Sequence, residues 1–132
     1  MEKAWIDAYL DQHWEEMVEA MKTLMRIPSV SGEPEGAYPF GKNCAEVLDT
    51  AFEMGRKMGM DTQNDDYYGG SILMRGEKDE EIGIFAHLDV VPEGTGWMQP
   101  PYAPYVRDNW LFGRGSADDK GAAVLALYAM DC

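Results

Sequence analysis

Apolar residues recur at helical spacing in two segments near the start of the chain. The first segment covers residues 2–27, and Pro28 directly after it is typical of a helix end. Its apolar positions are Trp5, Ile6, Tyr9, Leu10, Trp14, Met17, Val18, Met21, Leu24 and Met25. The second segment covers residues 41–58 and is followed by Gly59, a residue type that commonly ends a helix. We therefore predict two amphipathic helices, joined by a loop rich in serine, glycine and proline.

Short apolar runs predict strands in the middle of the chain. The candidates are residues 60–63, 71–75, 82–86 and 109–112. The run 82–86 is the most compact and is typical of a buried central strand. An irregular, proline-rich stretch covers residues 92–106, and an apolar helix is expected over residues 120–130. This alternation predicts an α/β fold with a mixed β-sheet flanked by helices, incomplete because no strand follows the last helix.

The charge and hydropathy of the chain argue against several classes of partner. The 132 residues include 11 basic and 24 acidic side chains, which gives a formal net charge of −13. Such a charge repels nucleic-acid phosphates and anionic lipid head groups, so we expect no nucleic-acid or membrane partner. The longest apolar stretch, residues 121–130, is too short to span a bilayer. The first residues lack the pattern of a secretory signal, and we expect a cytoplasmic protein.

Cysteine spacing argues against two common kinds of stabilising site. Cys44 and Cys132 are the only cysteines, and they have no CxxC spacing. This excludes a disulfide framework and a thiolate zinc site.

Of the two histidines, one lies at a position that suits ligand binding. His13 has polar neighbours in the first helix and is expected at the surface. His87 directly follows the apolar run 82–86, and open α/β sheets bind ligands at the ends of their strands. Residues two apart in an extended segment point to the same side, so Asp89 shares a face with His87. This arrangement suits a metal-bound imidazole whose other nitrogen is held by a carboxylate, although an ordinary hydrogen-bonded histidine gives the same pattern.

A glycine-rich turn with two adjacent aspartates precedes the last helix. It covers residues 113–121 and reads GRGSADDKG. A phosphate-binding loop is disfavoured, because the glycine pattern is incomplete and two carboxylates would oppose a phosphate. The remaining readings are a helix N-cap and a carboxylate metal ligand, and this segment alone does not decide between them.

Taken together, these segments closely resemble one known family. The matching motifs are residues 87–92 (HLDVVP), Trp97 with the segment 100–102 (PPY), and residues 111–121 (LFGRGSADDKG). They resemble the co-catalytic zinc peptidases, which include aminoacylases, carnosinases, succinyl-diaminopimelate desuccinylases and glutamate carboxypeptidases. Residues 27–30, 39–41 and 94–97 look more like the bacterial dipeptidase branch, of the Xaa-His dipeptidase and dipeptidase V type. The resemblance extends over about residues 24–130.

The resemblance implies roles for individual residues. His87 would be the imidazole ligand of one zinc ion, and Asp118 would bridge both zinc ions. Asp89 would be the catalytic-site carboxylate that orients and polarises His87. The family commonly has a cis peptide bond beside the bridging ligand, and we therefore expect one between Asp118 and Asp119.

The implied activity is hydrolysis of the amide bond of dipeptides or small N-acyl amino acids, by a water that bridges two Zn²⁺ ions. Mn²⁺ or Co²⁺ would also suit such ligands, and a small peptide is the expected substrate. The family's general-base glutamate, its remaining ligands and its lid domain have no counterpart here. We therefore expect residues 1–132 to form the N-terminal part of the catalytic domain, without the lid domain and the C-terminal half, and to be inactive alone.

Two other functions remain as alternatives. One is a non-catalytic remnant that acts as a binding or regulatory module, and the other is a nucleotide-binding α/β domain, which the glycine pattern and the acidic charge disfavour. An incomplete domain would also leave apolar surface uncovered, and we expect self-association through such a surface. The last helix is the expected place, at Val124, Leu125, Leu127 and Tyr128.

Overall fold

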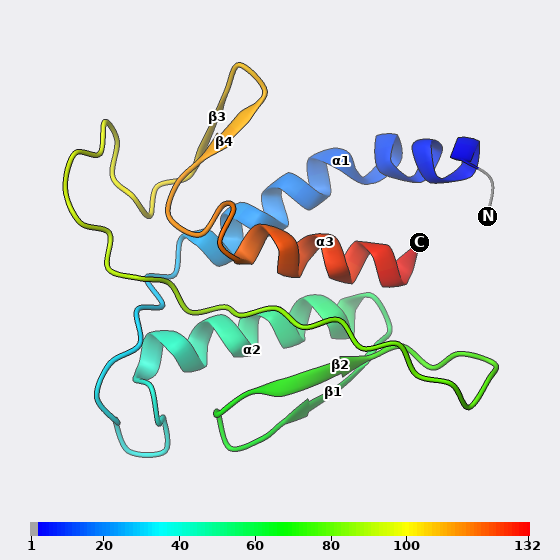
Figure 1. Cartoon of the computed structure of the whole chain (residues 1–132), viewed down its shortest axis with the longest axis horizontal. Helices are drawn as coiled ribbons and strands as arrows, with labels where there is room; N and C mark the ends of the chain where they lie inside the picture. The colour runs from blue at the N-terminus through cyan, green and yellow to red at the C-terminus, as the bar shows by residue number, and fades with distance from the viewer. Residues whose placement is uncertain (1–2) are drawn as a thin grey trace.

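The computed structural model describes residues 3–132, in which three helices and two β-hairpins form (Figure 1). The helices are α1 (Lys3–Met25), α2 (Lys42–Lys57) and α3 (Lys120–Asp131). They confirm the two helices predicted from apolar periodicity and the apolar helix expected over residues 120–130. Among the described residues, none of the helices has the length and apolar character needed to cross a membrane.

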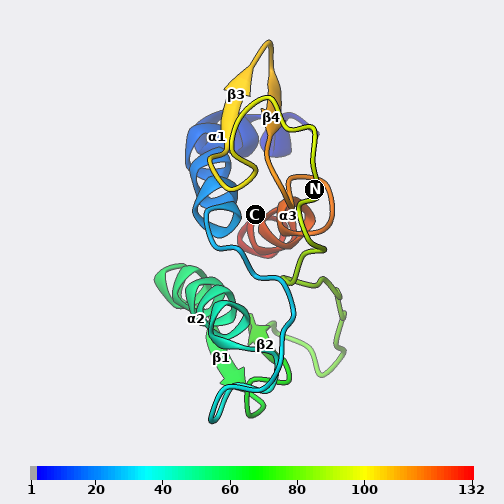
Figure 2. The same ribbon diagram turned by 90° about the vertical axis from the view of Figure 1, so that its left-hand side faces the viewer.

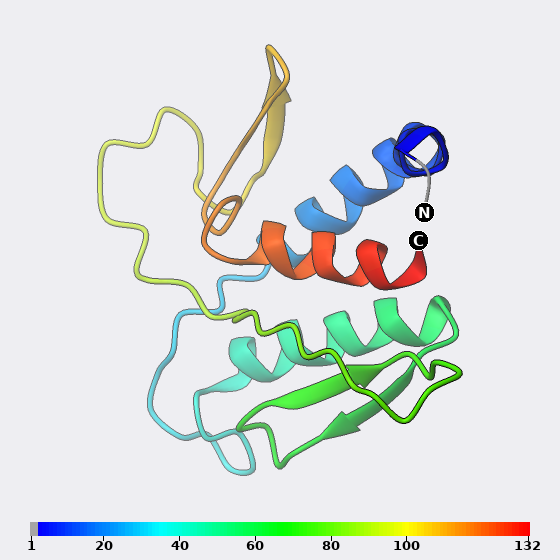
Figure 3. The same cartoon turned by 45° about the vertical axis from the view of Figure 1, so that its right-hand side comes forward.

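The helices pack around a common apolar core. Helix α3 lies between α1 and α2 in Figure 1, and Figure 3 gives the same order from another direction. The buried cluster consists of Met17, Leu24, Ile27, Val47, Ala51, Met60, Val124, Leu127 and Tyr128. All three helices contribute to it, but the predicted apolar face of α1 is buried only in part, since Trp5, Leu10 and Trp14 are 48%, 39% and 59% exposed.

The prediction that the apolar residues of helix α3 are uncovered is wrong for three of the four residues. Val124, Leu127 and Tyr128 were expected to be uncovered, but their exposed fractions are 0%, 6% and 5%. They are covered because α3 inserts between the other two helices. Leu125 is the exception, with 49% of its surface exposed.

Two separate antiparallel hairpins form instead of one mixed sheet. Strand β1 (Asp61–Asn64) pairs with β2 (Gly70–Leu73), and β3 (Tyr105–Arg107) pairs with β4 (Trp110–Phe112). The first hairpin lies beside α2, as Figure 2 also shows. The α/β class and the strands predicted near β1, β2 and β4 are confirmed. Strand β3 was missed because it lies at the end of the proline-rich stretch predicted as irregular.

The predicted central strand over residues 82–86 does not form. This segment is extended but has no strand partner among the described residues, and it runs within the long trace between the two hairpins (Figure 1). Ile82, Ile84 and Phe85 are 94%, 57% and 97% exposed. An apolar run becomes a buried strand only where neighbouring strands pair with it and other elements cover it, and here neither condition is met.

Leu127 and Leu125 of α3 provide a matched test of this packing. We expect Leu127→Ala to lower the free energy of unfolding by about 2–5 kcal/mol, because it leaves a cavity in the core. Leu125→Ala, at a half-exposed position on the same helix, should change it by about 0.5 kcal/mol. Urea unfolding followed by circular dichroism measures both values. Equal losses for the two variants would contradict the placement of α3.

The exposed apolar residues of segment 82–85 are one candidate surface for self-association, because Ile82 and Phe85 are almost fully exposed. We expect the 132-residue chain to associate as its concentration rises, since contiguous exposed apolar surface favours contact. Phe85→Asp should reduce this association, whereas Met98→Asp, at another exposed apolar position (85% exposed), should not. Light scattering over a dilution series is the measurement. A wild-type chain that stays monomeric at every concentration would refute the expectation.

Candidate metal centre

His87 lies between two carboxylates, one on each side of its ring. Its Nε2 is 2.9 Å from Oδ1 of Asp118, and its Nδ1 is 3.2 Å from Oδ1 of Asp89. The same Nδ1 is 3.1 Å from the backbone oxygen of Asp89. The structure thus brings together the three residues that the sequence motifs singled out. The shared face predicted for His87 and Asp89 from extended geometry is also observed.

The segment that carries His87 and Asp89 is held by Ser29. The Ser29 hydroxyl donates to the backbone oxygen of Leu88 at 2.7 Å, and the Val90 amide donates to the backbone oxygen of Ser29 at 2.9 Å. Val30 and Val90 form an isolated parallel β-bridge. These backbone contacts flank Asp89 on both sides, so they fix the otherwise irregular chain at the point where its functional side chains project.

Asp118 and Asp119 lie at the start of α3, joined by the cis peptide bond that the family resemblance predicted. Asp119 occupies the N-cap position, yet no side-chain hydrogen bond caps the helix. Its Oδ2 instead accepts a 3.4 Å hydrogen bond from the backbone amide of His87. Both aspartates thus face the His87 segment, and neither side chain makes a capping hydrogen bond to α3.

Two glycines let the turn before α3 approach its neighbours closely. Gly115 has a φ of +85°, and a Cβ there would come within 3.0 Å of the Lys120 side chain and 3.1 Å of Val90. A Cβ at Gly121 would overlap the backbone oxygen of Ser116. The positive φ and the close approach both require glycine at these positions.

The site favours a positive charge. The pKa of His87 is raised above its ordinary value: partial burial acts to lower it, but hydrogen bonds and charges from Asp89 and Asp118 outweigh that effect. Two carboxylates therefore contact the imidazole ring, while the carboxylate of Asp119 contacts the backbone amide of the same residue.

Imidazole and carboxylate groups are donors that bind divalent metals, but only a few of them meet at this site. Two donors of one tetrahedral zinc ion, each about 2.0–2.1 Å from the metal, lie about 3.3 Å apart, which is close to the observed separation of Nε2 and the Asp118 oxygen. Within residues 3–132, however, no group of three or more His, Cys, Asp and Glu side chains has an arrangement that could hold a metal ion. His13, the other histidine, lies elsewhere: it is partly buried on α1, stacked near Tyr9 and paired with Glu16.

Sequence reasoning missed two polar residues that support this site. Ser29 and Lys120 are the two buried polar or charged residues of the described chain, both 0% exposed. Burial lowers the pKa of Lys120 to about 8, while the charges of Cys44 and Asp89 oppose this effect. Both residues form hydrogen bonds with partners more than 50 positions away, so their roles cannot be predicted from the local sequence pattern.

Side-chain contacts also fix the loop over residues 93–97 beside the glycine-rich turn. The Arg114 guanidinium lies 5.3 Å from the ring centroid of Trp97 and donates to the backbone oxygen of Glu93 at 3.2 Å. The Trp97 indole donates to the same oxygen at 2.7 Å. These contacts hold the loop over residues 93–97 against Arg114, four positions before Asp118.

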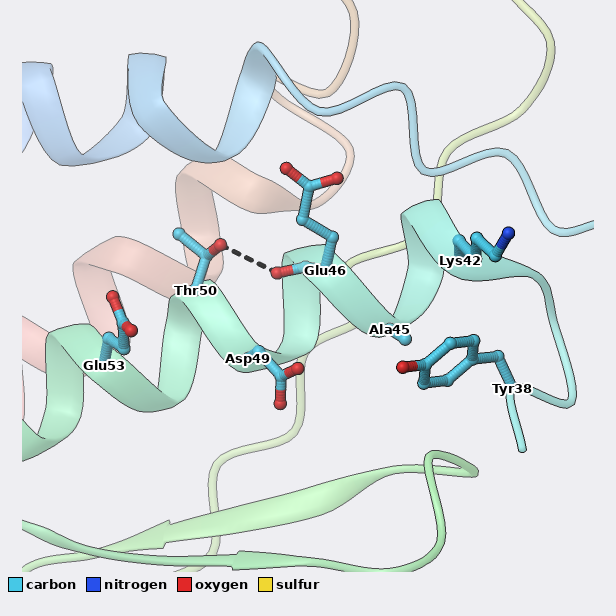
Figure 4. A pocket seen from close by; sticks show the side chains of 7 residues that line it. All are labelled: Tyr38, Lys42, Ala45, Glu46, Asp49, Thr50 and Glu53. Carbon is cyan, nitrogen blue, oxygen red and sulfur yellow. Dashed lines mark hydrogen bonds between the residues drawn. The ribbon is translucent and has the colours of Figure 1, made fainter. Parts of the chain in front are cut away.

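A hollow of about 400 Å³ lies along α2, away from these residues (Figure 4). It is lined by Tyr38, Lys42, Ala45, Glu46, Asp49, Thr50 and Glu53. Figure 4 shows the Thr50 hydroxyl donating to the backbone oxygen of Glu46, at 2.7 Å, rather than into the hollow. None of His87, Asp89 and Asp118 lines this hollow, so we place the candidate site at His87 instead.

Comparisons with known proteins agree with the family resemblance. Residues 83–132 match the model of peptidase family M20/M25/M40. The chain is 36% identical over 117 residues to a Staphylococcus epidermidis protein named "Putative dipeptidase", and 36% identical over 118 residues to "Putative dipeptidase YtjP" of Bacillus subtilis. These matches cover 87% and 88% of the chain but 25% of each relative, so the chain spans about a quarter of their length.

The fold also matches a solved structure. The crystal structure of human carnosine dipeptidase 1 aligns with a TM-score of 0.72 and 24% identity, covering 94% of this chain and 29% of that chain. The similarity supports the fold of the described residues.

Proposed function

We propose that the chain belongs to peptidase family M20/M25/M40, whose model matches residues 83–132, and that it carries part of the metal centre of a cytoplasmic dipeptidase. His87 and Asp118 bind a zinc ion, and the whole protein hydrolyses the amide bond of dipeptides or small N-acyl amino acids. The observation that carries the proposal is the placement of His87 between Asp118 and Asp89, at 2.9 and 3.2 Å.

Asp89 sets the tautomer and the orientation of the imidazole. By accepting the hydrogen bond from Nδ1–H, its oxygens would leave the lone pair of Nε2 available to a metal ion. A carboxylate in this position also makes the ring a stronger ligand. Asp89 therefore acts on the metal through His87.

Asp118 has the properties of a bridging ligand. One of its oxygens faces His87, and the side chain is 83% exposed, so its second oxygen is accessible to another ion. The backbone amide of His87 meanwhile bonds to Asp119, which keeps the two ligand-bearing segments next to each other.

A bound zinc ion would acidify a water and polarise the scissile carbonyl group of a small peptide. Zinc fits one imidazole with carboxylates, and Mn²⁺ or Co²⁺ accept the same donors. A catalytic zinc site has three protein ligands and an open position. Because His87 and Asp118 provide only two, we propose that the 132-residue chain binds metal weakly and does not catalyse alone.

A second candidate is a binding or regulatory module without catalysis. The observation that favours it is the absence, within residues 3–132, of any group of three or more metal-binding side chains. In such a module His87 would be an ordinary hydrogen-bonded histidine, and zinc would bind no better to it than to His13.

Zinc titration of the 132-residue chain separates the two candidates. We expect one weak site, measured by competition with a chromophoric chelator, that is lost in His87→Ala. Asp89→Asn should weaken it by about 10–100-fold, because the imidazole loses the group that orients it.

The matched control is His13→Ala, which removes the other histidine of the chain and should leave zinc affinity unchanged. If His87→Ala binds zinc as tightly as the wild type, the proposed metal centre is wrong and the module remains.

A further inference from the structure

The segment over residues 24–30 contacts both halves of the candidate metal site. On one side, Ser29 bonds to the backbone of Leu88 and Val90, on either side of Asp89. On the other side, the Lys120 ammonium donates to the backbone oxygens of Leu24 at 2.9 Å and Ile27 at 2.7 Å. We call residues 24–30 the brace. It lies between the segment that carries His87 and the helix start that carries Asp118.

The burial of Lys120 needs an explanation that core packing alone does not supply. Its side chain is 0% exposed, and an ammonium group loses much hydration free energy when it is buried. An apolar side chain of the same length would fill this space without that cost. The lysine is therefore best explained by the two hydrogen bonds that it donates to the brace.

The direction in which Lys120 reaches supports this explanation. It is the first residue of α3, where a positive charge is unfavourable to the helix dipole. Its ammonium group instead reaches the end of α1 (Lys3–Met25), where carbonyl groups lack helical partners and a positive charge is favourable. Lys120 thus joins the start of one helix to the end of another, two positions after Asp118.

We propose that the brace sets the spacing of the two metal ligands, and that Lys120 and Ser29 are its positioning residues. Lys120 fixes the start of α3 and therefore Asp118, while Ser29 fixes the segment of His87 and Asp89. The two positioning residues touch neither metal nor substrate. The inference rests on the proposed function only in treating His87 and Asp118 as metal ligands.

The test compares Lys120→Met with Lys57→Met in the 132-residue chain. Methionine keeps the length and apolar stem of Lys120 but donates no hydrogen bond. Lys57 is an exposed lysine at the end of α2 and serves as the matched control. The primary measurement, made without metal, is the nuclear Overhauser effect between the His87 ring and the β-protons of Asp118. Zinc affinity is the second measurement.

We expect Lys120→Met to lose this contact signal and to bind zinc about tenfold or more weakly, whereas Lys57→Met should match the wild type in both. Lys120→Arg keeps the charge and the donors and should recover part of both signals, which a purely space-filling role would not produce. A folded Lys120→Met that keeps the signal and the affinity would overturn the proposal.

Ser29→Ala keeps the proposal testable if Lys120→Met does not fold. It removes one hydroxyl and should weaken the same contact signal and speed hydrogen exchange of the Val90 amide, which bonds to the backbone of residue 29. A wild-type signal in Ser29→Ala would refute the brace. If the wild type itself binds no zinc but Lys120→Met loses the contact, the metal-centre proposal fails while the positioning role stands.

Discussion

The hydrogen bonds of the buried Lys120 ammonium to the end of α1 are the constraint on which the arrangement of this protein depends. They connect backbone oxygens at Leu24 and Ile27 to a residue more than 90 positions later. Because the ammonium group is removed from water, these bonds cannot be exchanged for hydration without opening the core. They therefore hold α1 and α3 in one relative position, and the apolar cluster between the helices then packs around that position.

The electrostatics of the candidate site follow from this placement. Holding Asp118 and Asp119 near the His87 segment brings two carboxylates toward a third, Asp89, in a chain with a formal net charge of −13. Asp89 and Asp118 each lie within 3.2 Å of the His87 ring, and such clustered negative charge raises the free energy of the folded state unless a cation balances it. The same two carboxylates raise the pKa of His87 and so favour its charged form, and a divalent ion would balance more of the negative charge. The placement of these aspartates thus favours a positive charge beside His87.

The sequence predicted local features well and long-range ones poorly. Helical periodicity identified α1 and α2, because the apolar residues of a helix face lie three and four positions apart, and α3 was recognised from its apolar composition. The strand predicted over residues 82–86 failed, since a strand depends on partners that its own residues do not specify. The family motifs identified His87, Asp89 and Asp118. Ser29 and Lys120 escaped notice because their partners lie 59 and more than 90 positions away.

The number of ligands and their spacing contribute separately to metal affinity. Two donors form fewer bonds than the three of a catalytic zinc site, which limits how tightly these residues alone can hold an ion. Favourable spacing raises affinity, because donors that are already fixed near the required separation lose little conformational freedom when the metal binds. Here Nε2 of His87 and Oδ1 of Asp118 are 2.9 Å apart on segments tied to a common backbone. In the proposed metal centre these two residues would therefore form a preorganised pair of ligands, to which any further ligand would add affinity without first having to assemble the site.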